Sequence, residues 1–204
     1  GLNSRDPAAE TGATPPPEPM IFMKATSAIC GPNDTIELPR GSTNTDWEVE
    51  LGIVIGKRAK YITEDQVMDH IAGFVAVNDV SEREYQKRRA GQFTKGKSCD
   101  TFGPIGPWLV TPDEIADPQT LGLRLMVNGE TRQHGNTADM IFGVVYSVAY
   151  LSQFMTLHPG DIIATGTPAG VGLGMDPPTF LKAGDEVVLE VDGLGQQRMI
   201  VAQG

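Results

Sequence analysis

The segment 46–55, Asp-Trp-Glu-Val-Glu-Leu-Gly-Ile-Val-Ile, constrains the fold more than any other part of the 204-residue sequence. Its odd positions are apolar without exception, whereas Glu48, Glu50 and Gly52 occupy even positions. Side chains alternate between the two faces of a β-strand, so the pattern predicts a strand with one face in the core. Both glutamates then lie on the other face, about 7 Å apart along the strand.

Further strands and helices are expected on both sides of this segment. The chain contains 24 glycines and 15 prolines, which favours many turns and a strand-rich fold. Periodicity and turn signals predict strands at 74–78, 121–127, 161–165, 186–191 and 197–201, and helices at 63–71, 82–89 and 140–154. The sequence therefore predicts an α+β fold that is dominated by strands and has a few short helices.

The charge balance and the cysteines limit the classes of partner. The chain has 16 basic and 26 acidic residues, a net charge of −10, which disfavours nucleic acid as a partner. No apolar run approaches the roughly 20 residues that a membrane span needs. Cys30 and Cys99 show no CxxC spacing, which fits a reducing cytosol and predicts a cytoplasmic protein.

Three acidic residues are candidate metal ligands. Glu48 and Glu50 share a strand face, and Asp79 follows the next predicted strand. Two such charges about 4 Å apart repel by about 4 kcal/mol at an effective dielectric constant of 20, so a proton or a divalent cation must relieve them. Oxygen ligands favour Mg²⁺, Mn²⁺ or Ca²⁺. The alternative interpretation is a solvated strand face with an acid near a helix start.

Two loops carry further candidates. Lys97 lies in Gly-Lys-Ser within the Gly- and Pro-rich segment 91–108, where it could approach an anionic group or simply be an exposed loop lysine. The segment 166–172, Gly-Thr-Pro-Ala-Gly-Val-Gly, could hold a carboxylate through its backbone N–H groups and the Thr167 hydroxyl, or form a plain turn. The three histidines have no spacing typical of a triad or a zinc site.

Four motifs, in this order, resemble the fumarylacetoacetate hydrolase family. They are Asp-Trp-Glu-Val-Glu-Leu-Gly at 46–52, Asn-Asp-Val-Ser-Glu-Arg-Glu-Tyr-Gln at 78–86, Gly-Lys-Ser at 96–98, and the glycine-rich segment 166–172. The match runs from Gly1 almost to the C-terminus. The stretch 95–111 further resembles the branch that hydrolyses 2,4-diketo-3-deoxy-L-rhamnonate and related diketo acids.

This resemblance implies a fold, a metal site and a reaction. The expected fold is the mixed β-roll of the family's C-terminal domain, usually dimeric, with residues 21–204 as the catalytic domain after an N-terminal segment 1–20. The residues that match the family's functional positions are Glu48, Glu50 and Asp79 as ligands of one Mg²⁺ or Mn²⁺, Lys97 as the active-site lysine, and Arg83, Gln86 and Thr167 as substrate contacts. The implied reaction is hydrolysis of a C–C bond in a small anionic 2,4-diketo acid, with release of pyruvate.

The N-terminal segment departs from the family pattern at the expected general base. Glu10 matches the family's catalytic acid, but Pro7 stands where the water-activating histidine is expected and Ser4 where a tyrosine is expected. Because proline cannot accept a proton, three alternatives remain open. The protein is a hydrolase, a 2-oxo acid decarboxylase or tautomerase on the same metal, or a homologue that binds ligand without turnover.

Overall fold

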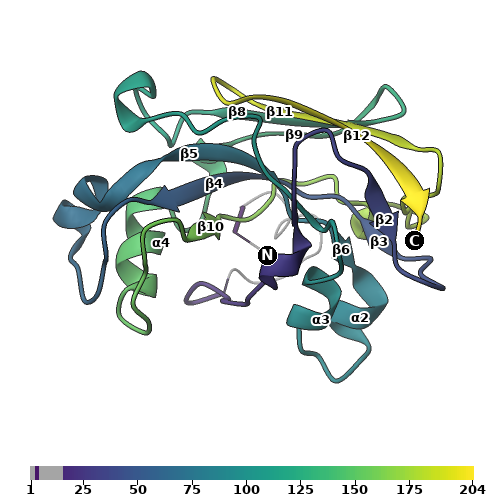
Figure 1. Cartoon of the computed structure of the whole chain (residues 1–204), viewed down its shortest axis with the longest axis horizontal. Helices are drawn as coiled ribbons and strands as arrows, with labels where there is room; N and C mark the ends of the chain where they lie inside the picture. The colour runs from purple at the N-terminus through teal and green to yellow at the C-terminus, as the bar shows by residue number, and fades with distance from the viewer. Residues whose placement is uncertain (1–2, 5–15) are drawn as a thin grey trace.

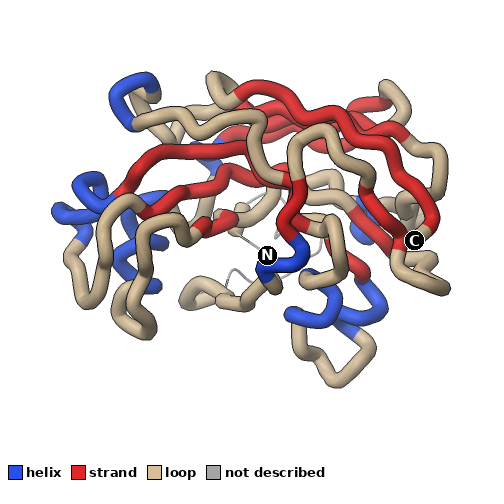
Figure 2. The backbone as a smooth tube through the Cα atoms, in the orientation of Figure 1, coloured by secondary structure: helices blue, strands red, loops and turns tan. Residues whose placement is uncertain are grey.

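The structure, a computed structural model, describes residues 3–4 and 16–204. Two larger sheets, of three and five strands, form its body (Figures 1 and 2), and two pairs of short strands flank them. The strands are β1 (Ile29–Cys30), β2 (Ile36–Leu38), β3 (Thr45–Asp46), β4 (Val49–Ile55), β5 (Ile71–Asn78), β6 (Ser81–Glu82), β7 (Gly103–Pro104), β8 (Gly122–Val127), β9 (Glu130–Asn136), β10 (Ile162–Ala164), β11 (Glu186–Val191) and β12 (Gly195–Gln203).

The helices are short. The α-helices of the described residues are α2 (Arg83–Lys87), α3 (Thr94–Lys97) and α4 (Val144–Leu151), and the 3-10 helices are η1 (Thr26–Ala28), η2 (Glu64–His70), η3 (Pro112–Glu114), η4 (Thr137–Asp139) and η5 (Gly172–Gly174). No helix in this part of the chain combines the length and the apolar character that crossing a bilayer requires. The predicted α+β, strand-dominated class is confirmed.

The two larger sheets pack face to face. The smaller has the order β10-β4-β5 and is antiparallel, and the larger has the order β2-β12-β11-β8-β9 with a parallel pair between β2 and β12. In Figure 1 strands β8, β9 and β11 of the larger sheet lie above β4 and β5, while α4 lies below them. Strand β4 contacts both β8 and β11, so it sits in the middle of the molecule.

The predicted apolar face of the segment 46–55 is confirmed as core. Trp47 and Leu51 are buried in one cluster with Leu125 of β8 and Leu189 of β11. All seven residues of β4 are buried, and Glu48, which directly precedes the strand, is 3% exposed. The acidic face is therefore not a solvated surface, and its charges must be balanced inside the protein.

The register between β4 and β5 sets the position of the acidic residues. Val49 pairs with Asn78, and the Asp79 N–H donates to the Glu48 carbonyl at 2.9 Å, so Glu48 and Asp79 are cross-strand neighbours. A shift of one residue would turn every side chain of β4 to the opposite face. The apolar residues that enter the core thus also determine where the carboxylates lie.

Two helices begin later than the sequence predicts. The helix expected at 82–89 is α2, because Ser81 and Glu82 pair with β3 as strand β6, and the Glu82 carboxylate caps the helix by accepting from the Tyr85 N–H. The helix expected at 140–154 is only α4, because the N–H groups of Ile141 and Phe142 donate to Asn3 oxygens instead of joining a helix. In both cases a distant segment forms hydrogen bonds with backbone groups that would otherwise belong to the first turn of the helix.

Other predicted elements differ less from those in the structure. The segment predicted as a helix at 63–71 is the 3-10 helix η2, with Thr63 and Gln66 as its capping box. The segment 91–108 is not a continuous loop, because it contains α3 and β7. The division of the chain at residue 20 stays a prediction.

Gly170 offers a test of how tightly the glycine-rich segment is packed. Its φ is +99°, and a Cβ there would lie 1.9 Å from the Arg132 carbonyl oxygen, whereas Gly184, with φ +94°, has open space. We expect Gly170→Ala to lower the free energy of unfolding by about 1–3 kcal/mol more than Gly184→Ala, since only the former adds a clash to the backbone strain. Urea unfolding measures both, and equal losses would contradict this packing.

Candidate functional site

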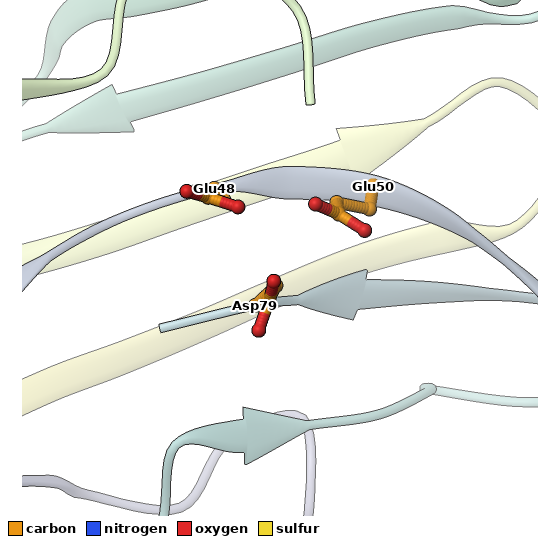
Figure 3. Close-up of side chains that lie close together, drawn as sticks. All are labelled: Glu48, Glu50 and Asp79. Carbon is orange, nitrogen blue, oxygen red and sulfur yellow. The ribbon is translucent and has the colours of Figure 1, made fainter. Parts of the chain in front are cut away.

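Three buried carboxylates lie together where β4 and β5 meet. Glu48, Glu50 and Asp79 each offer one oxygen, and these oxygens all lie within 4.8 Å of one another. Figure 3 shows the two glutamates along one strand and Asp79 just beyond the end of its neighbour. The structure thus brings together all three residues predicted as metal ligands.

Basic side chains surround this acidic trio. The Lys97 ammonium lies 3.0 Å from Glu48 Oε2 and 2.5 Å from Asp79 Oδ2. The Lys24 ammonium lies 2.6 Å from Asp79 Oδ1, and Arg83 Nη1 lies 2.7 Å from Glu48 Oε1. These contacts supply the positive charge that buried carboxylates need.

The pKa values reflect this pairing. Burial alone raises the pKa of Glu48, but the charges of Lys97 and Arg83 outweigh it and hold this pKa well below its ordinary value. Asp79 behaves in the same way, since Lys97 and Lys24 lower its pKa against the effect of burial. These two carboxylates are therefore ionised and able to act as ligands near neutral pH.

Glu50 differs from its two neighbours. Burial, together with the charges of Asp79 and Glu48, raises the pKa of Glu50 to about 8. Its Oε2 accepts the Gly166 N–H at 2.8 Å, so of the two alternatives left open for the glycine-rich segment, a backbone N–H does hold a carboxylate, but that carboxylate is the protein's own. A cation that binds here would have to displace the proton of Glu50.

Lys97 reaches the trio because α3 packs closely on α2. A Cβ at Gly96 would lie 2.5 Å from the Gln86 nitrogen and from the Glu82 carbonyl oxygen, so only glycine permits this approach. Lys97 is completely buried, with its ammonium 5.0 Å from the centre of the Phe22 ring, a cation–π distance. The alternative of an exposed loop lysine is wrong.

Arg83 belongs to a buried network that the sequence does not reveal. Its Nε donates to Asp46 Oδ2 at 2.8 Å, and its Nη1 donates to Gln86 Oε1 at 3.0 Å. The Asp46 carboxylate also accepts the N–H groups of Gly172 and Leu173. Asp46 thus fixes both Arg83 and the end of the glycine-rich segment.

Thr167 and Gln133 tie the glycine-rich segment to β4. The Thr167 hydroxyl donates to the Val49 carbonyl at 2.8 Å and accepts from Gln133 Nε2, while Gln133 Oε1 accepts the Val49 N–H. Thr167 therefore uses its only donor within the fold, and its contact with substrate stays a prediction. Gln133 is 84 residues from Val49, and no local signal could have found it.

The positions at which the family carries its general base and catalytic acid lie near the N-terminal end. Pro7 and Glu10 are outside the described residues, so their roles stay predictions. Ser4 is buried and forms an isolated antiparallel bridge with Met140.

A cavity of about 460 Å³ adjoins the trio. Asp79 and Gly166 form part of its wall, and most of the rest comes from the segment 19–29, from α4 and β10 and from the residues next to them, with Asn3, Val77 and Ile105 also lining it. Lys24, which belongs to none of the four sequence motifs, lines this cavity and also contacts Asp79. The trio is thus buried within the protein, and through Asp79 it borders a space of small-molecule size.

The side chains at the trio fit a hard divalent cation. All three candidate ligands are carboxylates, they lie in or directly beside the paired strands β4 and β5, and their oxygens converge within 4.8 Å. Burial makes such a convergence costly without a positive charge, and oxygen-only ligands favour Mg²⁺, Mn²⁺ or Ca²⁺ over thiophilic metals. Glu48, Glu50 and Asp79 would hold the ion.

Comparisons with known proteins identify the family of this chain. A family profile described as "Fumarylacetoacetate (FAA) hydrolase C-terminal" matches residues 1–202. A Burkholderia cenocepacia protein named "Putative hydrolase" is 59% identical over 198 residues, which are 97% of this chain and 70% of that protein.

Solved structures named for two activities share the fold. A fumarylacetoacetate hydrolase from Exiguobacterium antarcticum is 40% identical with a TM-score of 0.91, and the match covers 100% of this chain and 73% of that one. A 2-hydroxyhepta-2,4-diene-1,7-dioate isomerase from Mycobacterium marinum is 42% identical with a TM-score of 0.84, over 92% of this chain and 70% of that one.

Replacement of Asp79 tests the ligand assignment. We expect Asp79→Asn to weaken the binding of Mg²⁺ and Mn²⁺ at least about a hundredfold, because the change removes a charged ligand. Isothermal titration calorimetry measures this affinity. The exposed Asp113 provides the control variant Asp113→Asn, which should bind like the wild type. An unchanged affinity in Asp79→Asn would refute the assignment.

Replacement of Lys97 tests the charge balance. Without a divalent cation, Lys97→Met should lower the free energy of unfolding by about 3–5 kcal/mol, because two buried carboxylates lose their ammonium partner. Added Mn²⁺ should restore part of this loss by binding the folded state. Urea unfolding in EDTA and in Mn²⁺ measures both. Lys95→Met, an exposed change in the same helix, is the control; equal stability of the two variants would rule out the pairing.

Proposed function

Because the chain belongs to the fumarylacetoacetate hydrolase family, we propose that it is a divalent-cation-dependent hydrolase. Its substrate is a small 2,4-diketo acid, and the products are pyruvate and a carboxylic acid. The observation that carries this proposal is the buried trio of Glu48, Glu50 and Asp79, which borders a cavity at Asp79 and lies next to the buried Lys97. A 2-oxo acid offers the paired oxygens that such a site can bind.

The reaction balances without any co-reactant other than water. Water adds to the C4 carbonyl, the C3–C4 bond breaks, and its electron pair stays on C3 as the enolate of pyruvate. A proton at C3 then completes pyruvate, while C4 leaves as the carboxylic acid. The site must therefore stabilise negative charge at the 2-oxo end and activate a water near C4.

The residues divide these tasks. A bound Mg²⁺ or Mn²⁺ would supply Lewis-acid stabilisation of the charge that develops on the 2-oxo group. Lys97, fixed by its contacts with two carboxylates, adds a permanent positive charge that needs no reorganisation. Arg83 and Gln86 are buried and hydrogen-bonded to each other, and in this proposal they orient the substrate together with Thr167.

The activation of water rests on Glu10 in this proposal. A carboxylate can accept the proton of water, whereas Pro7, which stands in place of the family's histidine, cannot. Hydrolysis without that histidine would be slower than in relatives that carry it. The substrate contacts, the general base and the expected homodimer all remain proposals.

A second candidate function is isomerisation of a 2-hydroxydienoate or its 2-oxo tautomer. The Mycobacterium marinum neighbour is named for such an activity, and this chemistry moves a proton between carbons without adding water. It therefore needs the charge-stabilising half of the site but no histidine near residue 7. Decarboxylation of a 2-oxo acid such as oxaloacetate has the same requirement.

One set of assays separates these functions. We expect Mg²⁺-dependent release of pyruvate from 2,4-dioxopentanoate, and a rate at least about a hundredfold lower in EDTA, which removes the cation, or in Glu50→Gln, which removes one of its ligands. Lactate dehydrogenase coupling measures the pyruvate. Glu114→Gln, an exposed change, should have no effect.

Other outcomes point elsewhere. An ultraviolet change with 2-hydroxy-2,4-dienoates but no pyruvate would support isomerisation, and CO₂ from oxaloacetate alone would support decarboxylation. Cation-dependent binding of 2-oxo acids with no turnover of any substrate would contradict an enzymatic function and support a silent homologue.

A further inference from the structure

The cavity next to the acidic trio has mainly apolar walls. Asp79 and Gly166 mark its end at the trio, and β10, α4 and the segment 19–29 enclose most of the remainder. Apolar side chains that line it come from all three of these elements or their ends: Met20, Phe22, Phe142, Leu151, Met155 and Ile162. A substrate held by its 2-oxo end at the trio would extend its other end along these side chains.

Among the described residues, the cavity offers no uncommitted cation for a second carboxylate. Of the described residues that line it, only Lys24 is basic, and its ammonium already contacts Asp79 Oδ1 at 2.6 Å and the Val80 carbonyl at 3.1 Å. Asp161, which directly precedes β10, adds a negative charge to the wall. A distal carboxylate on the substrate would lose its hydration and face Asp161 without a partner.

The polar side chains of the wall are largely committed to the fold. Asn3 donates to the carbonyls of Phe142 and Thr165 and accepts the Phe142 N–H. The hydroxyl of Ser147 donates to the Phe142 carbonyl, and that of Thr165 donates to the Leu51 carbonyl. These groups offer few free donors to the hydroxyls of a sugar-derived tail.

We propose that the substrate is a diketo monoacid with an uncharged, apolar tail, and that this tail lies in the cavity beside Ile162. The proposal rests on the proposed function, because the position of the tail follows from a 2-oxo acid bound at the trio. A cavity of about 460 Å³ lies within the range of small-molecule sites. Each buried methylene strengthens binding roughly fourfold. The proposal disfavours both a sugar-acid tail and a dicarboxylate.

The test compares three 2-oxo acids that cannot undergo the C3–C4 hydrolysis. Calorimetry at saturating Mg²⁺ gives the dissociation constants of pyruvate, 2-oxooctanoate and 2-oxooctanedioate. We expect 2-oxooctanoate to bind at least tenfold more tightly than either of the others. Pyruvate represents the head alone, and the dioate has the same chain length with a distal charge.

A pair of variants locates the tail. Ile162 on β10 is 37% exposed and lines the cavity, so Ile162→Lys should be tolerated and should place a positive charge beside the tail. We expect the ratio of the two C8 affinities to shift at least tenfold toward 2-oxooctanedioate. Ile200→Lys makes the same change at a similarly exposed position on β12, outside the cavity wall, and should leave the ratio unchanged.

The outcomes distinguish the two proposals. If none of the three acids binds in the presence of Mg²⁺, the proposed function fails and this inference fails with it. If the acids bind but 2-oxooctanoate has no advantage, only the apolar tail is refuted. If 2-oxooctanoate is preferred but Ile162→Lys does not change the ratio, the tail lies elsewhere and the assignment to this cavity is overturned.

Discussion

Buried negative charge is the constraint on which the rest of this structure depends. Glu48 and Asp79 lie next to each other inside the protein and stay ionised because Lys97 and Arg83 contact them. Glu50, the third acid of the trio, has its pKa raised to about 8 instead. A buried carboxylate can be stabilised by pairing with a basic side chain or by protonation, and this site uses both. A divalent cation is the third, and the geometry of the three oxygens suits it.

Strand β4 links the buried carboxylates to the hydrophobic core. Trp47 and Leu51 on one face fill the space between the sheets, which fixes the position of the glutamates on the other face. Interactions from distant segments then surround that second face. Gln133 bonds to the backbone of Val49 between the two glutamates, and the Gly166 N–H bonds to Glu50. The packing that stabilises the fold is therefore also what orients the carboxylates.

The two ends of the proposed substrate meet different environments. At the trio the protein gathers ionised groups around the proposed site for a 2-oxo acid, and this arrangement suits any reaction that develops an enolate, including hydrolysis and isomerisation. Farther along the cavity the walls are apolar, and the one basic side chain among the described lining residues, Lys24, is engaged with Asp79. In our proposals the first region sets the chemistry and the second sets the choice of substrate.

The sequence by itself determined most of the strand predicted at 46–55, which is β4 from Val49 onward, together with the strand-dominated class and the candidate trio. Alternation of side chains is a local property, and the motif order indicated the family. The sequence could not place Asp46, Gln133 or Lys24 in the site, since their contacts join residues far apart in the chain. Only the tertiary structure decided that the acidic face is buried, that Lys97 lies within it, and that α4 begins at Val144, where Asn3 no longer competes for the backbone. Burial and competition for hydrogen bonds depend on which distant segments come into contact, and this cannot be predicted from local periodicity.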